Sequence, residues 1–331
     1  MSALRGRRER GALLLALLLA GAPRAAPAQA TGTTAGALLA IPATARSLGL
    51  GGAYTAVVGD EGNIFVNPAG LAGIAHAALG VSYEKYLFDS YLVSGGVAVR
   101  SGRLDLGLGV EMLDFGRDTV YRPDPLFGQT RGVADPGGAM VGAYNAAATG
   151  AVAWRLGMFS LGGSVKYLKE HMSIPDTTLY DASGYGFDVG GAFAFFDIAA
   201  FGVVVQNLGP DLKTNTGKGA PLPRTVRAGF SLNVVDPQGT PRLMVVGDWV
   251  SPRGAKAYWI FGVEGGIVAG GASGVGLLGR AGIATGQAPS DRKALSLGGG
   301  LVFHNLRIDY AYQGFSTLGT ATQRIGLRWL P

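Results

Sequence analysis

The chain has 331 residues, of which 48% are hydrophobic and only 15% are charged, and its formal net charge is +6. It contains 56 glycines and no cysteine, which excludes disulfides, zinc–thiolate sites and cysteine nucleophiles. The first 30 residues hold five arginines and one glutamate, so the remaining chain carries only +2. The basic balance therefore gives little support to nucleic-acid binding, and no nucleic-acid partner is expected.

Residues 1–30 have the three parts of a secretory signal peptide. An arginine-rich head precedes an apolar run from Ala12 to Ala20, and the segment ends on Ala-Gln-Ala at 28–30. The run is too short to span a bilayer, and a short membrane anchor is the alternative interpretation. Because there is no cysteine to lipidate, a lipoprotein signal is excluded. We therefore predict export with cleavage of this leader.

Residues 31–76 precede the first strand-like pattern and contain a helix start. In "GNIFVNPAGLAGI" (62–74), Asn67 suits the N-cap position, and Pro68 suits the first helical position, where its missing N–H costs nothing. A helix cap accounts for this local pattern. Because the segment comes before the first strand, we also predict that residues 31–76 fold into the lumen of a barrel as a hatch, anchored by this turn.

From Ala77 onward, apolar residues occupy every second position for about ten residues before a turn follows. In "GRLDLGLGVEM" (102–112), leucines and a valine alternate with Asp105, two glycines and Glu111. This period is typical of strands, and the glycines indicate a second face that is small or polar. Roughly fourteen such segments occur. They start near Ala77, Ser90, Gly102, Tyr144, Phe159, Ser183, Asp197, Pro223, Pro241, Ala255, Gly274, Ala294, Arg307 and Thr322.

An even number of antiparallel strands, each about ten residues long, is typical of a bacterial outer-membrane barrel. The connections alternate between tight turns, such as 100–103 and 156–158, and long polar ones. Short periplasmic turns with long outer loops are the known asymmetry of such barrels. We therefore predict an all-β fold, a transmembrane antiparallel β-barrel of about 14 strands over residues 77–331 with an N-terminal plug in the lumen. The predicted long outer connections are 116–143, 170–183, 207–222 and 286–293.

Two alternatives remain for this pattern. A soluble β-sandwich or β-propeller also alternates, but its exposed face should carry many more charged residues. Residues 189–205 are apolar enough for a transmembrane helix except for Asp197, and we predict two strands joined at Phe196–Ile198 instead.

The last predicted strand ends on Trp329, a terminal aromatic of the kind that barrel-assembly machinery reads, although Leu330 and Pro331 follow it.

The sequence contains short matches to two ligand-binding motifs, but neither has the surrounding pattern that the motif requires. "GVGLLG" (274–279) matches a dinucleotide fingerprint but is not followed by a helix pattern, and "TNTGKGA" (214–220) lacks the Ser or Thr of a phosphate loop. The three histidines are far apart and show no metal spacing. We therefore expect no enzymatic activity, no catalytic residues, no metal and no cofactor.

Charged residues inside the predicted strands fall mostly on the small-residue face. A charge facing lipid at mid-bilayer would cost about 2–4 kcal/mol, so these side chains should face the lumen. They could form an interior ion-pair network that ties the barrel to whatever fills it, which we favour, or a polar lining for a transport path. The residues are Asp105, Glu111, Lys166, Asp188, Arg227, Asp248, Glu264, Arg280, Arg307, Asp309, Arg324 and Arg328.

Residues 43–74 resemble the head of the PorV/PorQ proteins, outer-membrane barrels related to the FadL long-chain fatty-acid transporters. The shared elements are the run from Arg46 to Ala53, the Asp60–Glu61 pair and Asn-Pro-Ala-Gly-Leu from Asn67 to Leu71. "SGYGFDVGG", "VVQNLGPDLK" and "RIDYAYQGF" match further along. The resemblance implies a fourteen-strand barrel with an amino-terminal plug. The residues it marks for the hatch are Gly51, Gly52, Asp60, Asn67, Pro68, Ala69 and Gly70.

The resemblance implies a non-enzymatic protein of the cell outer membrane, in contact with outer-membrane lipid. PorV-like members serve type IX secretion, so secreted cargo proteins or other secretion-system subunits are the expected partners. The alternative is a FadL-like channel for long-chain fatty acids or other hydrophobic small molecules. No residue separates the two functions, and the first is our main expectation.

Overall fold

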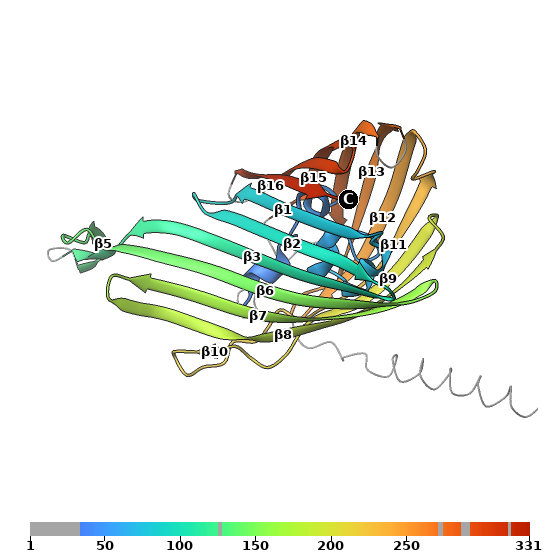
Figure 1. Ribbon diagram of the computed structural model, residues 1–331. Coiled ribbons are helices and arrows are strands. Elements are labelled where there is room, and N and C mark those ends of the chain that lie inside the picture. The colour runs from blue at the N-terminus through green and yellow to red at the C-terminus, as the bar shows by residue number, and fades with distance from the viewer. Residues whose placement is uncertain (1–33, 125–127, 271–273, 286–291, 317–318) are drawn as a thin grey trace, which may run out of the picture.

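The computed structural model describes residues 34–124, 128–270, 274–285, 292–316 and 319–331. Within these residues, fourteen long strands form a closed antiparallel barrel, in which each strand pairs with the next along the chain and β1 pairs with β17 (Figure 1). The fourteen are β1 (Ala77–Lys85), β2 (Tyr91–Ser101), β3 (Leu104–Thr119), β6 (Met140–Leu156), β7 (Phe159–Ile174), β8 (Thr177–Phe195), β9 (Ala199–Leu208), β11 (Thr225–Val235), β12 (Pro241–Pro252), β13 (Tyr258–Ala269), β14 (Val275–Thr285), β15 (Arg292–Phe303), β16 (Leu306–Phe315) and β17 (Ala321–Trp329).

The sequence alternation sets the two faces of the wall. On β3, Leu106 and Leu108 are exposed on the outside, whereas Asp105 and Glu111 are buried inside. The same pattern of outward apolar and inward polar or small residues recurs along β1 and β17, which close the ring with Val81 opposite Leu327. The predicted barrel of about 14 strands is therefore confirmed. None of the helices among the described residues is long and apolar enough to cross a membrane.

Some predicted boundaries were wrong. Residues 170–183 are not a long connection, because β7 and β8 continue to a two-residue turn at Pro175 and Asp176, where Asp176 has a positive φ of 59°. The connection 116–143 contains a hairpin of its own, formed by β4 (Tyr121–Asp124) and β5 (Gly128–Ala134). Apolar residues are sparse in both regions, so alternation gave no strand signal there.

Other connections follow the expectation. Residues 196–198 form a tight turn between β8 and β9, which excludes a helix over 189–205. The connection 207–222 is long and holds only the two-residue strand β10 (Lys213–Thr214), which pairs with β8. Most of the predicted loop at 286–293 and the whole predicted leader at 1–30 lie outside the described residues. The tight turns at 102–103, 157–158, 196–198 and 304–305 lie at one end of the barrel, called here the short-turn end. The opposite end, called here the long-loop end, carries the long connections and also the short turn at 175–176.

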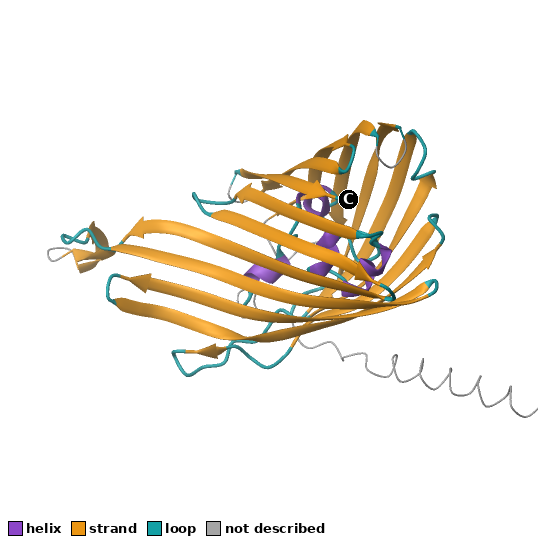
Figure 2. Cartoon of the chain, viewed as in Figure 1, coloured by secondary structure: helices purple, strands orange, loops and turns teal. Residues whose placement is uncertain are grey.

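Residues 34–76, called here the N-terminal segment, lie inside the ring of strands (Figure 2). Asn67 caps a 3-10 helix through its side-chain oxygen, which accepts from the N–H of Ala69 at 3.2 Å, with Pro68 in the first turn. The predicted N-cap is therefore confirmed, although the helix is 3-10 rather than α. The helical pieces are η1 (Ala37–Ala40), α2 (Ala45–Gly49), η2 (Glu61–Ile64) and η3 (Pro68–Gly73).

The apolar residues of the N-terminal segment pack against two different parts of the wall. Ile64, Phe65, Leu71 and Ile74 pack on small alanines of β1, β2 and β6. Leu50, Tyr54, Val57 and Val66 pack on Val246, Val250 and Ile260 of β12 and β13. Burial of each large apolar side chain contributes about 1.5–3 kcal/mol, so the N-terminal segment is a shared core for strands that do not touch each other.

Inward-facing glycines permit this close packing. A Cβ at Gly162 on β7 would lie 2.2 Å from the backbone nitrogen of Ala69. A Cβ at Gly282 on β14 would lie 2.2 Å from the backbone nitrogen of Gly51. In both places backbone meets backbone, so no flexible side chain can move aside. Much of the unusual glycine content of the strands is therefore explained by the need to admit the N-terminal segment.

We predict that Gly162→Val displaces the N-terminal segment from the wall, because its new side chain overlaps the Ala69 backbone. Limited proteolysis of the refolded barrel in detergent should then cut within residues 34–76, which the unaltered protein resists. Gly163→Val is the matched control, since a Cβ there would lie no closer than 3.6 Å to the Asp188 carbonyl oxygen. Equal protease resistance of Gly162→Val and the unaltered protein would contradict the close approach.

Candidate functional site

The N-terminal segment is joined to the wall by a closed ring of six alternating charges, called here the ionic ring. The segment supplies Arg46 and Asp60, which are 2.9 Å apart. The wall supplies two acids and two arginines from β13, β14, β16 and β17. The remaining pairs are Arg46–Glu264 at 2.7 Å, Glu264–Arg280 at 2.5 Å, Arg280–Asp309 at 2.7 Å, Asp309–Arg328 at 2.6 Å and Arg328–Asp60 at 2.5 Å.

The ionic ring satisfies each of its charges twice and sums to zero. Arg46 binds Glu264 in a bidentate manner, through Nε at 2.9 Å and Nη2 at 2.7 Å. Five of the six side chains are no more than about a tenth exposed. Removing two charges from water is costly unless both are paired and hydrogen-bonded. Every member of the ring has two partners of opposite charge, although Nη2 of Arg280 and Nη2 of Arg328 have no hydrogen-bond partner among the described residues.

Strand β15 lies between β14 and β16 and contributes glycines in place of a charge. A Cβ at Gly300 would lie 3.0 Å from both Asp309 Oδ1 and Arg280 Nη2. Arg280 Nη1 also donates to the carbonyl oxygen of Gly299 at 3.0 Å. The Gly298–Gly300 run therefore lets the Arg280–Asp309 pair bridge across an intervening strand.

The two neighbouring acids Asp60 and Glu61 have pKa values shifted in opposite directions. Burial opposes ionisation of Asp60, but Arg328 and Arg46 lower its pKa to about 2. Burial raises the pKa of Glu61 to about 7, and the charge of Asp60 adds to the rise. Neither oxygen of the Glu61 carboxyl group has a hydrogen-bond partner among the described residues, and the group lies against Gly80 of β1. Near neutral pH, Glu61 is therefore a buried acid that is easily protonated.

Further polar contacts hold the N-terminal segment on the other walls. Asp248 of β12 accepts from the N–H groups of Tyr54 and Thr55 at 3.0 and 3.1 Å and pairs with Arg227 at 2.6 Å. Asn67 Nδ2 donates to the Thr55 carbonyl oxygen at 2.8 Å and to that of Gly191 on β8 at 3.4 Å. Asn67 thus caps its helix and contacts the wall at the same time.

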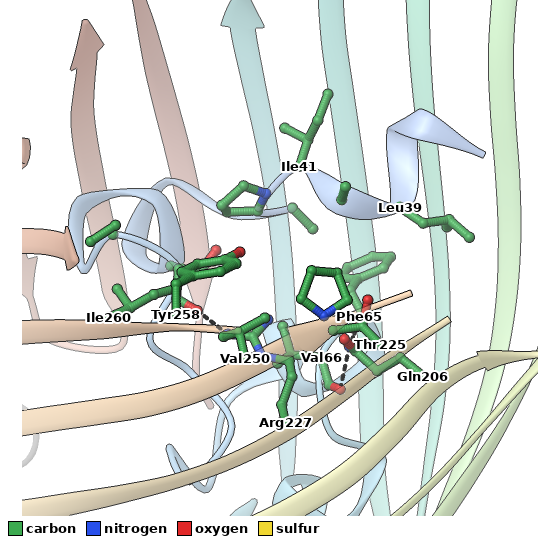
Figure 3. A pocket seen from close by; sticks show the side chains of 18 of the residues that line it. Leu39, Ile41, Phe65, Val66, Gln206, Thr225, Arg227, Val250, Tyr258 and Ile260 are labelled. Atoms are coloured by element: carbon green, nitrogen blue, oxygen red, sulfur yellow. Dashed lines mark hydrogen bonds between the residues drawn. The ribbon is translucent and has the colours of Figure 1, made fainter. Parts of the chain in front are cut away.

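A cavity of about 170 Å³, called here the long-loop cavity, lies between the N-terminal segment and the wall (Figure 3). Leu39 and Ile41 lie on one side of it, and Arg227 and Val250 lie across from them (Figure 3). Much of its lining is apolar, with polar groups at a few points. The apolar lining includes Leu39, Ile41, Phe65, Val66, Val250, Tyr258 and Ile260, and the polar lining includes Glu111, Lys166, Gln206, Arg227, Lys293 and Gln313.

The predicted lumen charges all lie on inward faces, but they form separate groups. Asp105 pairs with Arg155, Lys166 with Asp188 at 2.8 Å, and Arg324 with Glu84. Glu111 lines the long-loop cavity, and Arg307 lies at the short-turn end. Of the residues marked for the hatch, Gly51 and Gly52 line the long-loop cavity, Asp60 belongs to the ionic ring, and Asn67, Pro68, Ala69 and Gly70 form the η3 turn.

Sequence reasoning missed Arg46, Glu84 and Arg155 as charge partners. Glu84 and Arg155 lie on strands whose alternation could have placed them on the inward face beside Arg324 and Asp105. Arg46 lies outside any strand, so no periodic signal identified it. No group of three or more His, Asp or Glu residues in the described ranges is arranged to hold a metal ion.

Comparison with known proteins supports the fold. A model described as "Uncharacterised protein family (UPF0164)" matches residues 19–176, somewhat less than half of the chain. No curated protein matches the chain. The toluene transporter TbuX of Ralstonia pickettii superposes with a TM-score of 0.56 at 13% identity, over 87% of this chain and 97% of TbuX.

Two further solved structures agree. A FadL homologue of Pseudomonas aeruginosa gives a TM-score of 0.55 at 13% identity, over 87% of this chain and 98% of the homologue. The CymD monoaromatic hydrocarbon channel gives 0.56 at 14% identity, over 87% and 95% of the two chains. The chain therefore has a FadL-like barrel fold.

We predict that Arg46→Met destabilises the barrel by about 3–5 kcal/mol, because it leaves Asp60 and Glu264 buried with one partner fewer each. Equilibrium unfolding in urea, followed by tryptophan fluorescence in detergent, measures the loss. Lys85→Met is the control, since the Lys85–Asp89 pair is largely exposed, with side chains 72% and 93% accessible. Equal unfolding midpoints for Arg46→Met and Lys85→Met would show that the ionic ring contributes nothing.

We predict a pH dependence of stability that comes from Glu61. Its pKa is raised in the folded chain, so the folded chain binds the proton more tightly, and the free energy of unfolding falls as pH rises from about 4.5 to about 7. Glu61→Gln, which mimics the protonated acid, should remove this fall and be the more stable form at pH 8. Parallel pH profiles of the two proteins across that window would refute the assignment.

Proposed function

We propose that the protein is a non-enzymatic channel of the bacterial outer membrane for small hydrophobic compounds. The long-loop cavity is the observation that carries the proposal. Apolar protein cavities of about 150 Å³ are known to bind benzene, so about 170 Å³ suits a molecule with one aromatic ring. Leu39, Ile41 and Phe65 are among the apolar residues of the lining that such a solute would contact.

The outer face supports the membrane location. Leu108 is 66% exposed, Ile325 58% and Leu277 64%, on strands from different parts of the ring. Exposed apolar side chains on every second residue around a closed barrel match a surface that faces lipid, because all backbone groups are paired within the ring. The tight turns would then face the periplasm and the long loops the exterior, with the protein exported through a signal peptide at residues 1–30.

The N-terminal segment would act as the hatch of this channel. It covers the short-turn side of the long-loop cavity with residues that include Gly51, Phe65 and Val66. A solute that leaves toward the periplasm would have to pass it. We accordingly place the domain boundaries at residues 31–76 for the hatch, which would gate the channel, and at 77–331 for the barrel, which would form its wall.

The FadL-like solved structures support this reading better than our main expectation from the sequence. TbuX is described as a toluene transporter and CymD as a monoaromatic hydrocarbon channel. A secretion accessory of PorV/PorQ type, with cargo proteins or secretion subunits as partners, stays a prediction without a structural observation in its favour. Recognition of β17 by barrel-assembly machinery likewise stays a prediction.

We predict that cells producing the protein take up radiolabelled toluene faster than cells without it. A disulfide between Ala45→Cys and Gly326→Cys should remove this gain, because it ties the N-terminal segment to β17. A Cβ at Gly326 would lie 3.1 Å from the Ala45 Cβ, so the two backbones must separate by a few tenths of an ångström to reach the roughly 3.5–4.5 Å of a disulfide, and the chain has no other cysteine.

The two single-cysteine variants and the reduced double variant are the controls, and each should transport like the unaltered protein. Uptake no faster than in cells lacking the protein would refute the channel. Uptake that persists in the oxidised double variant would refute the hatch and leave the channel intact.

A further inference from the structure

A second cavity, of about 230 Å³, lies on the opposite side of the N-terminal segment and is called here the short-turn cavity. The wall residues that line it lie in the short-turn halves of β11, β12, β13, β14 and β16, whereas the long-loop cavity takes several of its wall residues from the other ends of β11, β12 and β13. Arg46, Val57 and Val58 of the N-terminal segment close one side of it. The two cavities share no lining residue.

Cations outnumber anions in this lining. Arg46, Arg242 and Arg307 contribute guanidinium groups, and Glu264 contributes the one carboxylate. Both oxygens of Glu264 are already engaged, by Arg46 at 2.7 and 2.9 Å and by Arg280 at 2.5 Å. Glu264 is therefore balanced within the ionic ring, as is Arg46, so neither contributes unbalanced charge to the cavity.

Arg307 is the group that the ionic ring does not balance. Among the described residues it forms no salt bridge, and its buried Nε has no hydrogen-bond partner. It sits opposite Arg328 in the β16–β17 register, so a second cation lies on the neighbouring strand. A guanidinium group in such a place is stabilised by an anion, because partly buried charges are normally paired.

The rest of the lining restricts which anion fits. Val57, Leu243, Met244 and Leu278 line the same space as Arg307. A bare inorganic ion would leave these apolar surfaces in water, whereas an anion with a small apolar body would cover them. Guanidinium groups pair with carboxylates through two parallel hydrogen bonds.

We propose that the short-turn cavity binds a small organic monocarboxylate, with its carboxylate on Arg307 and its apolar body against Leu243 and Met244. The site is separate from the long-loop cavity and does not depend on the transport of hydrocarbons. It gives the chain a second ligand class, one that is charged and meets the protein at its short-turn end.

Equilibrium dialysis of radiolabelled benzoate against the purified full-length barrel in a neutral detergent tests the site. The unaltered protein should bind benzoate saturably, and added inorganic phosphate or benzyl alcohol should displace it poorly. Arg307→Gln should weaken binding at least about tenfold, and Arg307→Lys should weaken it less, because the charge remains. Arg100→Gln, which alters an exposed arginine at the same end of the barrel, is the matched control and should bind normally.

Heat-modifiable mobility on gels confirms that each variant is folded. Absence of saturable benzoate binding, or equal binding by Arg307→Gln and the unaltered protein, would overturn the proposal. Displacement by phosphate as readily as by unlabelled benzoate would replace it with a general oxyanion site. The toluene uptake assay does not depend on benzoate binding. A failure of the carboxylate site can therefore be distinguished from a failure of the channel.

Discussion

The ionic ring is the constraint on which the lumen of this protein depends. A buried charge without a partner is strongly destabilising, and here the four charges of the wall pair with one another in a row. Arg46 and Asp60 of the N-terminal segment close that row into a ring by pairing with Glu264 and Arg328 at its two ends. Without the N-terminal segment, Glu264 and Arg328 would each lose one of their two ion-pair partners. Burial of Tyr54 and Leu71 against separate walls adds an apolar core to this polar anchor.

The barrel could be predicted because the alternation of apolar and polar residues along each strand shows which side chains face outward and which face the lumen. In β3, the alternation of leucines with Asp105 and Glu111 fixes which residues face in, and a slip of one position would reverse every side chain. Where outward residues are not apolar, as on either side of Pro175, that signal fades and the boundary was misplaced. Secondary structure was therefore most predictable where the strand meets an apolar surface.

The partners of the inward charges could not be predicted from the sequence. Alternation shows that Arg280 and Asp309 face the lumen, but not that they meet across β15 above Gly300. That contact depends on how β14, β15 and β16 lie beside one another and on the lack of side chains at Gly299 and Gly300. Arg46 was hidden for another reason, because it lies in a short helix whose position is set by long-range packing and not by a local pattern.

The N-terminal segment separates two cavities of different character. The long-loop cavity has a lining of both apolar and polar residues, and the short-turn cavity is lined by Arg307, which forms no salt bridge among the described residues. Gly51, Phe65 and Val66 of the N-terminal segment line the first cavity, and Arg46, Val57 and Val58 of the same segment line the second. The same segment that completes the ionic ring therefore also contributes lining to both cavities.

Charge balance in the ionic ring has a consequence for movement of the N-terminal segment. Arg46 and Asp60 sum to zero, and so do Glu264, Arg280, Asp309 and Arg328, which would stay behind on the wall. With Glu61 protonated, displacement of the N-terminal segment carries no net charge along the barrel axis, so an electrical potential across the membrane would neither drive nor oppose it. The four wall charges that remain in the lumen would also sum to zero among themselves.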